Sequence, residues 1–186
     1  MLGTVPAELT QVENLYGVES DGTKAEKQNL LPLGFSITYR KNQPFPHTLH
    51  LVPKTVVLGI GCKRGTEAES IRALIRETLE QNQIFKESIC LIASIDLKKD
   101  EEGIRICAEE LGVPFVTWSA EELEQVRSED GFTESAFVRS VAGVGNVCER
   151  SALKGAGTSR LLIRKTAHNG VTVAAAVKDY TVCMED

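Results

Sequence analysis

A glycine-rich stretch between an apolar run and a helix-start signal carries the densest set of chemically useful residues. Glycines let the backbone turn sharply and approach a ligand closely. Free N–H groups ahead of a helix attract anions, and two basic side chains add full positive charges. The alternative is a tight turn with two solvated basic residues. The stretch predicts a binding site for an acidic ligand, with the candidate residues Gly59, Gly61, Cys62, Lys63, Arg64, Gly65 and Thr66.

A second polar cluster, Ser94-Ile-Asp96-Leu-Lys98-Lys-Asp-Glu101, follows the next apolar run. Asp96 or Glu101 is a candidate general base, and Lys98 is a candidate clamp for a carboxylate or stabiliser of an oxyanion. The structural alternative is that Asp96 turns the chain and that Glu101 complements the dipole of the following helix. Both interpretations stay open at this point.

A third cluster, Gly143-Val-Gly145-Asn-Val-Cys-Glu149, forms a second glycine turn that enters a helix. Both glycines are candidate binding residues, and Glu149 is a further candidate catalytic carboxylate. A position in the first helical turn also explains this glutamate through the helix dipole alone.

The five cysteines show no C-x-x-C pair, which favours reduced, mostly structural thiols. Cys62 stands beside two basic residues, so a lowered pKa and a nucleophilic role are one interpretation. A small residue that fits the turn is the other. The three histidines are scattered through predicted loops and strands, so we expect no metal site.

The glycine stretch matches neither of the common nucleotide-binding motifs. Arg-Gly-Thr stands where a Walker loop has Gly-Lys-Thr, and the third glycine comes one residue late for a dinucleotide fingerprint. A nucleotide-binding module therefore remains only an alternative function.

The totals describe an ordinary globular chain. At 186 residues, with 42% hydrophobic and 25% charged residues, it can form one packed domain with an appendage. A net charge of −5 gives no indication of nucleic-acid binding. No apolar run is long enough to cross a membrane and the first residues lack a signal-peptide layout, so we expect a cytoplasmic protein.

Hydrophobic patterning from residue 53 onward alternates strands and helices, which predicts parallel strand pairing. Thr66 with Glu69 has the spacing of a capping box for the first helix, and so has Ser119 with Glu122 for a later one. The predicted strands are Thr55–Gly59, Ser88–Ser94 and Pro114–Trp118, and the intervening helices are Thr66–Asn82 and Lys99–Leu111.

The C-terminal third predicts helices over 119–127, Glu134–Ser140 and Val147–Lys154, the last one capped by Asn146. Two strand-like runs, Arg160–Lys165 and Val171–Val177, flank Asn169-Gly170, a strong hairpin signal. We therefore expect an α/β fold, a three-layer α/β/α sandwich with a mixed sheet: parallel core strands and a C-terminal antiparallel hairpin.

Residues 1–52 differ from the rest. They are polar at first and then carry two strand-like pieces, Gly34–Arg40 and Thr48–Val52, with prolines between them. Two short strands are too little for an independent core. We interpret residues 1–52 as the remnant of a central or linker region and residues 53–186 as the α/β domain.

The clusters together resemble the CbiG family of cobalamin biosynthesis and, more remotely, the shorter CobE proteins. The matching stretches occur in the family's order over 55 to about 180, and only their combination is specific. They are Gly-Ile-Gly-Cys-Lys-Arg-Gly-Thr (59–66), Ser-Ile-Asp-Leu-Lys-Lys-Asp-Glu (94–101), Gly-Val-Gly-Asn-Val-Cys-Glu (143–149) and Val-Thr-Val-Ala (171–174).

This resemblance implies a cobalt-precorrin-5A hydrolase, which opens a δ-lactone on the macrocycle and releases acetaldehyde. The implied partner is a cobalt-containing tetrapyrrole polycarboxylate whose cobalt belongs to the substrate, so no cofactor is expected. Other enzymes of the pathway are further candidate partners. Full-length members carry an additional N-terminal domain and a complete central region, so the alternative function is a non-catalytic corrinoid carrier.

Overall fold

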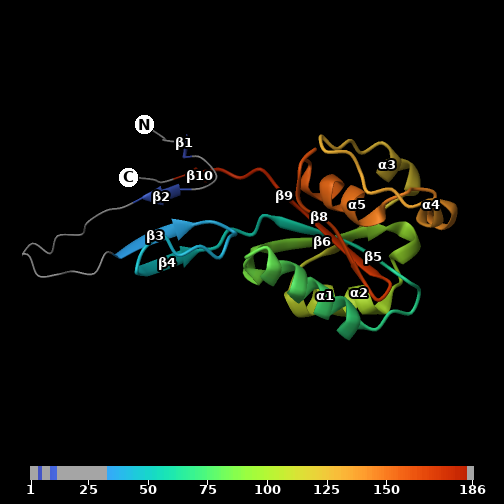
Figure 1. Cartoon of the computed structure of the whole chain (residues 1–186), viewed down its shortest axis with the longest axis horizontal. Helices are drawn as coiled ribbons and strands as arrows, with labels where there is room; N and C mark the ends of the chain where they lie inside the picture. The colour runs from blue at the N-terminus through green and yellow to red at the C-terminus, as the bar shows by residue number, and fades with distance from the viewer. Residues whose placement is uncertain (1–3, 6–8, 12–32, 184–186) are drawn as a thin grey trace, which may run out of the picture.

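A five-stranded mixed sheet forms the centre of the molecule. The computed structural model describes residues 4–5, 9–11 and 33–183. The strands of the central sheet lie in the order β7–β6–β5–β9–β8 (Figure 1). Their bounds are Val56–Cys62 for β5, Ile89–Ile95 for β6, Phe115–Trp118 for β7, Leu161–His168 for β8 and Val171–Val177 for β9.

Strand direction within this sheet confirms the predicted mixture. β5, β6 and β7 pair in parallel, whereas β9 is antiparallel to both of its neighbours, β5 and β8. The β8–β9 turn has Asn169 at φ 48° and Gly170 at φ 81°. Two successive residues with positive φ are what a tight hairpin turn with the right-handed strand twist requires. The Asn-Gly signal therefore predicted the hairpin correctly.

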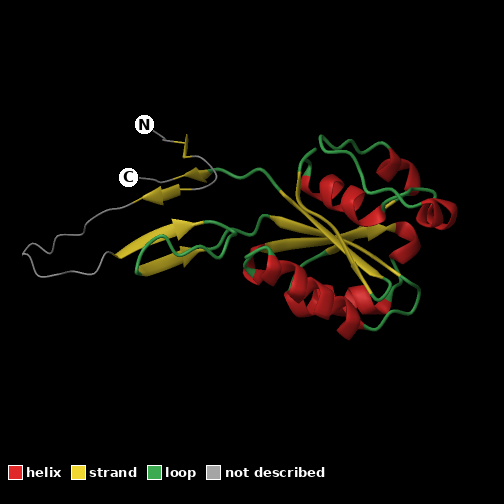
Figure 2. Cartoon of the chain, viewed as in Figure 1, coloured by secondary structure: helices red, strands yellow, loops and turns green. Residues whose placement is uncertain are grey.

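Helices cover both faces of the sheet and give the expected three layers (Figures 1 and 2). One core joins Leu58 and Ile60 of β5 to the apolar side of α1 and α2, and a second core joins Val57 of β5 to α5. Successive side chains of a strand point to opposite faces, so one apolar run supplies both cores. The helices are α1 (Ala68–Gln81), α2 (Glu102–Leu111), α3 (Ala120–Glu124), α4 (Ala136–Ala142) and α5 (Val147–Ala156).

Three of the predicted helix starts are displaced. α4 begins at Ala136 instead of Glu134, with Ser135 as its N-cap, and the other two lie near the glycine stretch. Glu67 is the N-cap of α1 without any side-chain cap, because the hydroxyl of Thr66 instead donates to the carbonyl of Lys63 at 2.7 Å. α2 begins at Glu102, not Lys99, because residues Asp96–Lys98 form a 3₁₀ turn, η2. The other short 3₁₀ helix, η1, spans Lys86–Ser88. By contrast, the Ser119–Glu122 capping box of α3 is confirmed.

Short strands outside the central sheet make two small additions. β2 (Leu9–Gln11), β3 (Leu33–Ile37) and β4 (His47–Leu51) form a three-stranded sheet, and β1 (Thr4–Val5) pairs with β10 (Val182–Cys183). An isolated bridge between Arg40 and Ile84 connects the segment after β3 to the end of α1. Most of the polar first part of residues 1–52 lies outside the described residues.

No helix in the described part of the chain combines the length and the apolar character needed to span a membrane.

Candidate functional site

The three clusters singled out in the sequence meet at the carboxyl edge of β5 and β6. Residues 63–67 follow β5, residues 96–101 follow β6, and the turn 143–146 leads into α5. Ile95, at the end of β6, packs against Val144 and Val147 at the start of α5. Glu101 links the first two segments by accepting a hydrogen bond from the Gly65 N–H. Open α/β folds bind ligands at this edge, so the site is assembled where the topology favours it.

Glu101 fastens the glycine loop to the loop after β6. One carboxylate oxygen accepts from the Gly65 N–H, and the other accepts from the Lys98 ammonium at 2.9 Å. The Glu101 side chain is only 8% exposed and that of Lys98 only 16%. Burial by itself raises the pKa of the Glu101 carboxyl, but the hydrogen bonds from Lys98 and the loop backbone outweigh it, so its pKa lies below the ordinary value.

The carboxylate of Glu101 therefore accepts a hydrogen bond from the backbone N–H of the glycine loop that was expected to bind an acidic ligand. The Gly65 N–H faces Glu101, and a backbone hydrogen bond from Thr66 reaches the same carboxylate. Lys63 and Arg64 are exposed, so their positive charges are accessible from solvent. The backbone N–H of Lys63 donates to the carbonyl of Gly170 at 3.1 Å, so the β8–β9 hairpin supports the loop from the other side.

Gly59 and Gly61 allow close packing of α5 and β9 against β5. A Cβ at position 59 would overlap the carbonyl of Cys148 and lie 2.7 Å from the Ala152 nitrogen, both in α5. A Cβ at position 61 would lie 2.7 Å from the hydroxyl oxygen of Thr172. Gly59 is buried inside the protein, so its structural task is to admit the helix, whereas Gly61 is partly exposed at the edge.

Glu149 is fully buried at the start of α5. One carboxylate oxygen accepts from the Thr133 N–H at 2.9 Å and the Asn146 amide at 2.6 Å, and the other accepts from the Lys165 N–H at 2.8 Å. Buried charge is tolerated when it is hydrogen-bonded in this way. The carboxylate joins the loop before α4 and strand β8 to α5, and this geometry suits a structural role.

The turn before α5 is also tightly packed. Gly143 ends α4 in the left-handed region at φ 79°, as a helix C-cap commonly does. A Cβ at position 145 would overlap the carboxylate of Glu134. That carboxylate pairs with Arg150 at 2.9 Å and Arg139 at 3.0 Å, so the glycine lets an ion-pair network close over the turn.

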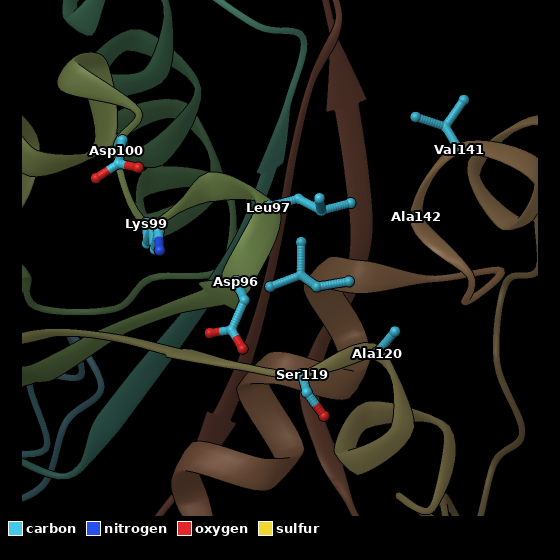
Figure 3. A pocket seen from close by; sticks show the side chains of 9 residues that line it. Asp96, Leu97, Lys99, Asp100, Ser119, Ala120, Val141 and Ala142 are labelled. Carbon is cyan, nitrogen blue, oxygen red and sulfur yellow. The ribbon is translucent and has the colours of Figure 1, made fainter.

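An open cleft lies at the carboxyl ends of β6 and β7, beside the loop after β6 (Figure 3). Its volume is about 560 Å³, within the usual range for ligand pockets. One wall is the loop after β6 with Asp96 and Leu97, and the opposite wall is the end of α4 with Val141. Ser119 and Ala120, where β7 passes into α3, line the cleft below them.

With Asp100, Asp96 is one of the two carboxylate residues that line this cleft. One of its oxygens accepts a hydrogen bond from the Thr117 hydroxyl at 2.6 Å, across neighbouring parallel strands. The residue is exposed, and no hydrogen bond to its second oxygen is present among the described residues. The arrangement fixes the orientation of the carboxylate and leaves one oxygen available to a water or a substrate proton.

The four cysteines whose side chains the structure describes lack the features of nucleophiles. Burial raises the pKa of the Cys62 thiol, and the nearby positive charge of Lys98 offsets this only in part. The expected lowering of its pKa is therefore wrong. The effect of burial, which raises the pKa of the thiol, is larger than the effect of nearby positive charge, which lowers it. Burial raises the pKa of Cys107 and Cys148 to about 11. These four thiols, including Cys90, are free.

Sequence reasoning missed several residues that shape the site. Thr117 orients Asp96, and its only signal was a polar residue near the end of a strand adjacent to β6. Gly103 brings α2 against the glycine loop, because a Cβ there would overlap the carbonyl of Thr66. Leu97 and Val141 flank the cleft. The sequence signal for Leu97 was an apolar residue inside an otherwise polar loop. No group of three or more metal-binding side chains occurs in the part of the chain that the structure describes.

Comparison with known proteins places this architecture in a family. The family model described as cobalamin synthesis G C-terminus (CbiG_C) matches residues 56–176. A cobalt-precorrin-5A hydrolase from Salmonella typhimurium is 38% identical over 72% of this chain and 37% of its own length. One from Priestia megaterium is 34% identical over 69% of this chain and 33% of its own length. The chain thus spans about a third of the length of these two hydrolases.

The shorter relatives match over more of their length. The protein CobE from Sinorhizobium is 34% identical over 58% of this chain and 70% of its own length. The crystal structure of a CobE, from the cobalamin biosynthetic pathway, superposes with a TM-score of 0.61 at 28% identity, covering 77% of this chain and 97% of that one. The resemblance noted in the sequence is thereby confirmed, and the chain belongs to the CbiG C-terminal family and is related to CobE.

Proposed function

We propose that this chain acts in cobalamin biosynthesis as a cobalt-precorrin-5A hydrolase, opening the δ-lactone of the macrocycle with release of acetaldehyde. The names of two relatives at 34% and 38% identity support this assignment. The observation that carries it is the position of Asp96: an oriented carboxylate with one free oxygen, in an open cleft, beside a loop with two exposed cations.

Asp96 is the general base of the proposed reaction. Its free oxygen accepts a proton from a water molecule, and that water attacks the lactone carbonyl carbon. The acyl–oxygen bond then breaks, the proton held by Asp96 passes to the departing alkoxide oxygen, and the lactone opens to a carboxylate and a hydroxyl group. The hydroxyl-bearing carbon then leaves as acetaldehyde: its bond to the macrocycle breaks, its O–H proton is lost, and the bonding electron pair stays on the macrocycle, which takes up a proton. Thr117 holds the other oxygen of Asp96, so the base keeps one orientation through this step.

Glu101 was the other candidate for the base, and its surroundings argue for a positioning role. Both of its oxygens already accept hydrogen bonds, and its pKa is held below the ordinary value. Such a carboxylate is a poor proton acceptor at neutral pH. Its ion pair also neutralises Lys98, so Lys63 and Arg64 are the cations offered to the carboxylate arms of the substrate.

The test is to incubate the purified chain with cobalt-precorrin-5A and to measure two products: the macrocycle by mass spectrometry, whose mass should change by the addition of one water and the loss of one acetaldehyde, and acetaldehyde by a coupled dehydrogenase. The D96N variant should lose activity by roughly 10²- to 10⁴-fold, the usual contribution of a general base. D130N, at an exposed aspartate between α3 and α4, is the matched control and should keep full activity.

Three results decide the matter. Turnover that depends on Asp96 supports the hydrolase. Full turnover in D96N refutes the role of this carboxylate. Tight binding of the substrate without turnover by the unaltered chain refutes the hydrolase and favours the carrier.

A further inference from the structure

Two of the most exposed large apolar side chains of the described residues flank the cleft. Leu97 is 61% exposed on the wall after β6, and Val141 is 65% exposed on the wall formed by α4. The Leu97 side chain extends from its loop toward the side of the cleft where Val141 and Ala142 lie (Figure 3). Single exposed apolar residues are common, but a pair on opposite walls of one cleft is a feature of binding sites.

Charge is distributed unequally between the cleft and the adjacent loop. The cleft is lined by two carboxylates, Asp96 and Asp100, and by one ammonium group, Lys99. The glycine loop instead exposes two adjacent cations, Lys63 and Arg64. The carboxylate arms of a polyacid are therefore disfavoured in the cleft and favoured at the loop.

We propose that Leu97 and Val141 form an apolar clamp on the hydrocarbon part of the tetrapyrrole ring, while its acid arms extend to Lys63 and Arg64. This inference rests on the proposed function and gives the substrate an orientation in the site. A volume of about 560 Å³ suits one uncharged edge of a macrocycle rather than the whole ring. The edge held between the two apolar side chains is the one that meets Asp96.

The orientation follows from the residues that share the cleft. Leu97 and Asp96 both line it, so a ring edge held by this leucine lies in the same cleft as the free carboxylate oxygen. An electrically neutral lactone fits beside this carboxylate, whereas a free acid arm would be repelled by it. The clamp thus selects both which edge of the ring enters and which functional group reaches the base.

The test measures binding separately from turnover. The probe is cobyrinic acid, a stable cobalt corrin that carries several carboxylates. Binding is followed by isothermal titration calorimetry and by quenching of the single tryptophan, Trp118, which directly precedes Ser119 in the cleft. L97S and V141S should each weaken binding by about tenfold, as expected when a buried apolar side chain becomes polar.

Salt dependence separates the clamp from the cations. The losses in L97S and V141S should be equal at low and high ionic strength, because they arise from apolar contact. L49S is the matched control: Leu49 is 60% exposed on β4, outside the cleft, and its replacement should leave affinity unchanged. All three side chains are exposed, so their replacement by serine should not disturb folding, and a loss of binding is attributed to the lost apolar contact.

Wild-type affinity in both L97S and V141S would overturn the clamp even if the chain hydrolyses its substrate. So would losses that vanish at high salt, or no binding of cobyrinic acid by the unaltered chain. A chain that binds the probe through the two apolar residues but never turns over cobalt-precorrin-5A keeps the clamp and loses the proposed function. The two failures are therefore distinguishable.

Discussion

Replacing Glu101 by glutamine tests the internal carboxylate that holds the glycine loop. E101Q can keep one acceptor for the Gly65 N–H, but its amide then presents N–H groups to the Lys98 ammonium, a donor facing a donor. A hydrogen bond to a charged group contributes about 1.5–3 kcal/mol, so we expect E101Q to lose about 2 kcal/mol of unfolding free energy at pH 7.

The pH dependence of this loss identifies its cause. The pKa of Glu101 is lower in the folded chain, so its contribution is fully present above the unfolded value and disappears as pH falls through the folded one. Urea unfolding curves of the wild type and E101Q should therefore differ at pH 7 and converge as the pH falls through the folded pKa of Glu101, which lies below its ordinary value.

Glu102 provides the matched control, because it neighbours Glu101 but is 74% exposed and lies 3.9 Å from its partner Arg105. E102Q should change the unfolding free energy by less than about 0.5 kcal/mol at either pH. A loss in E101Q that is the same at pH 3 as at pH 7, or no loss at pH 7, would refute the reasoning about the carboxylate.

Three further expectations concern neighbouring residues. G59A should lower the unfolding free energy by about 3 kcal/mol in urea titrations, since its new Cβ has no room beside the carbonyl of Cys148; an unchanged midpoint contradicts this packing. The double variant K63A/R64A should bind cobyrinic acid roughly tenfold more weakly at low salt and nearly equally at high salt; a loss independent of salt excludes direct charge pairing. Cys62 should react slowly with a thiol reagent at pH 7, because burial raises its pKa; reaction at the rate of free cysteine argues against that burial.

Patterns that depend on neighbours in sequence predicted the fold well. The apolar run through Val57 and Leu58, the Asn169-Gly170 turn and the Ser119 capping box each depend on short-range geometry, and each appears as expected. The Thr66 capping box failed because the same hydroxyl found a closer acceptor in its own loop. A motif with two local solutions cannot be decided without the tertiary structure.

The candidate site could be located but not resolved from the sequence. Parallel topology brings the loops after β5 and β6 to one edge, so their convergence was predictable. The division of roles between Asp96 and Glu101 was not, because it depends on partners at long range: Thr117 for one, and the N–H of Gly65 for the other. Their roles in catalysis stay predictions until the variants are assayed.

The two walls of the cleft have unequal support. The Asp96 wall follows directly from a central strand and is fastened by Glu101, whereas the α4 wall packs through Val138 and Ala142 onto a small core and is otherwise held by ion pairs of Arg139 near the surface. The first wall is suited to keep reacting atoms in register, and the second has fewer contacts to break if it shifts. Ligands that differ in bulk would thus be accommodated by adjustment on one side only, and relatives that act on different ring acids should vary most in this helix.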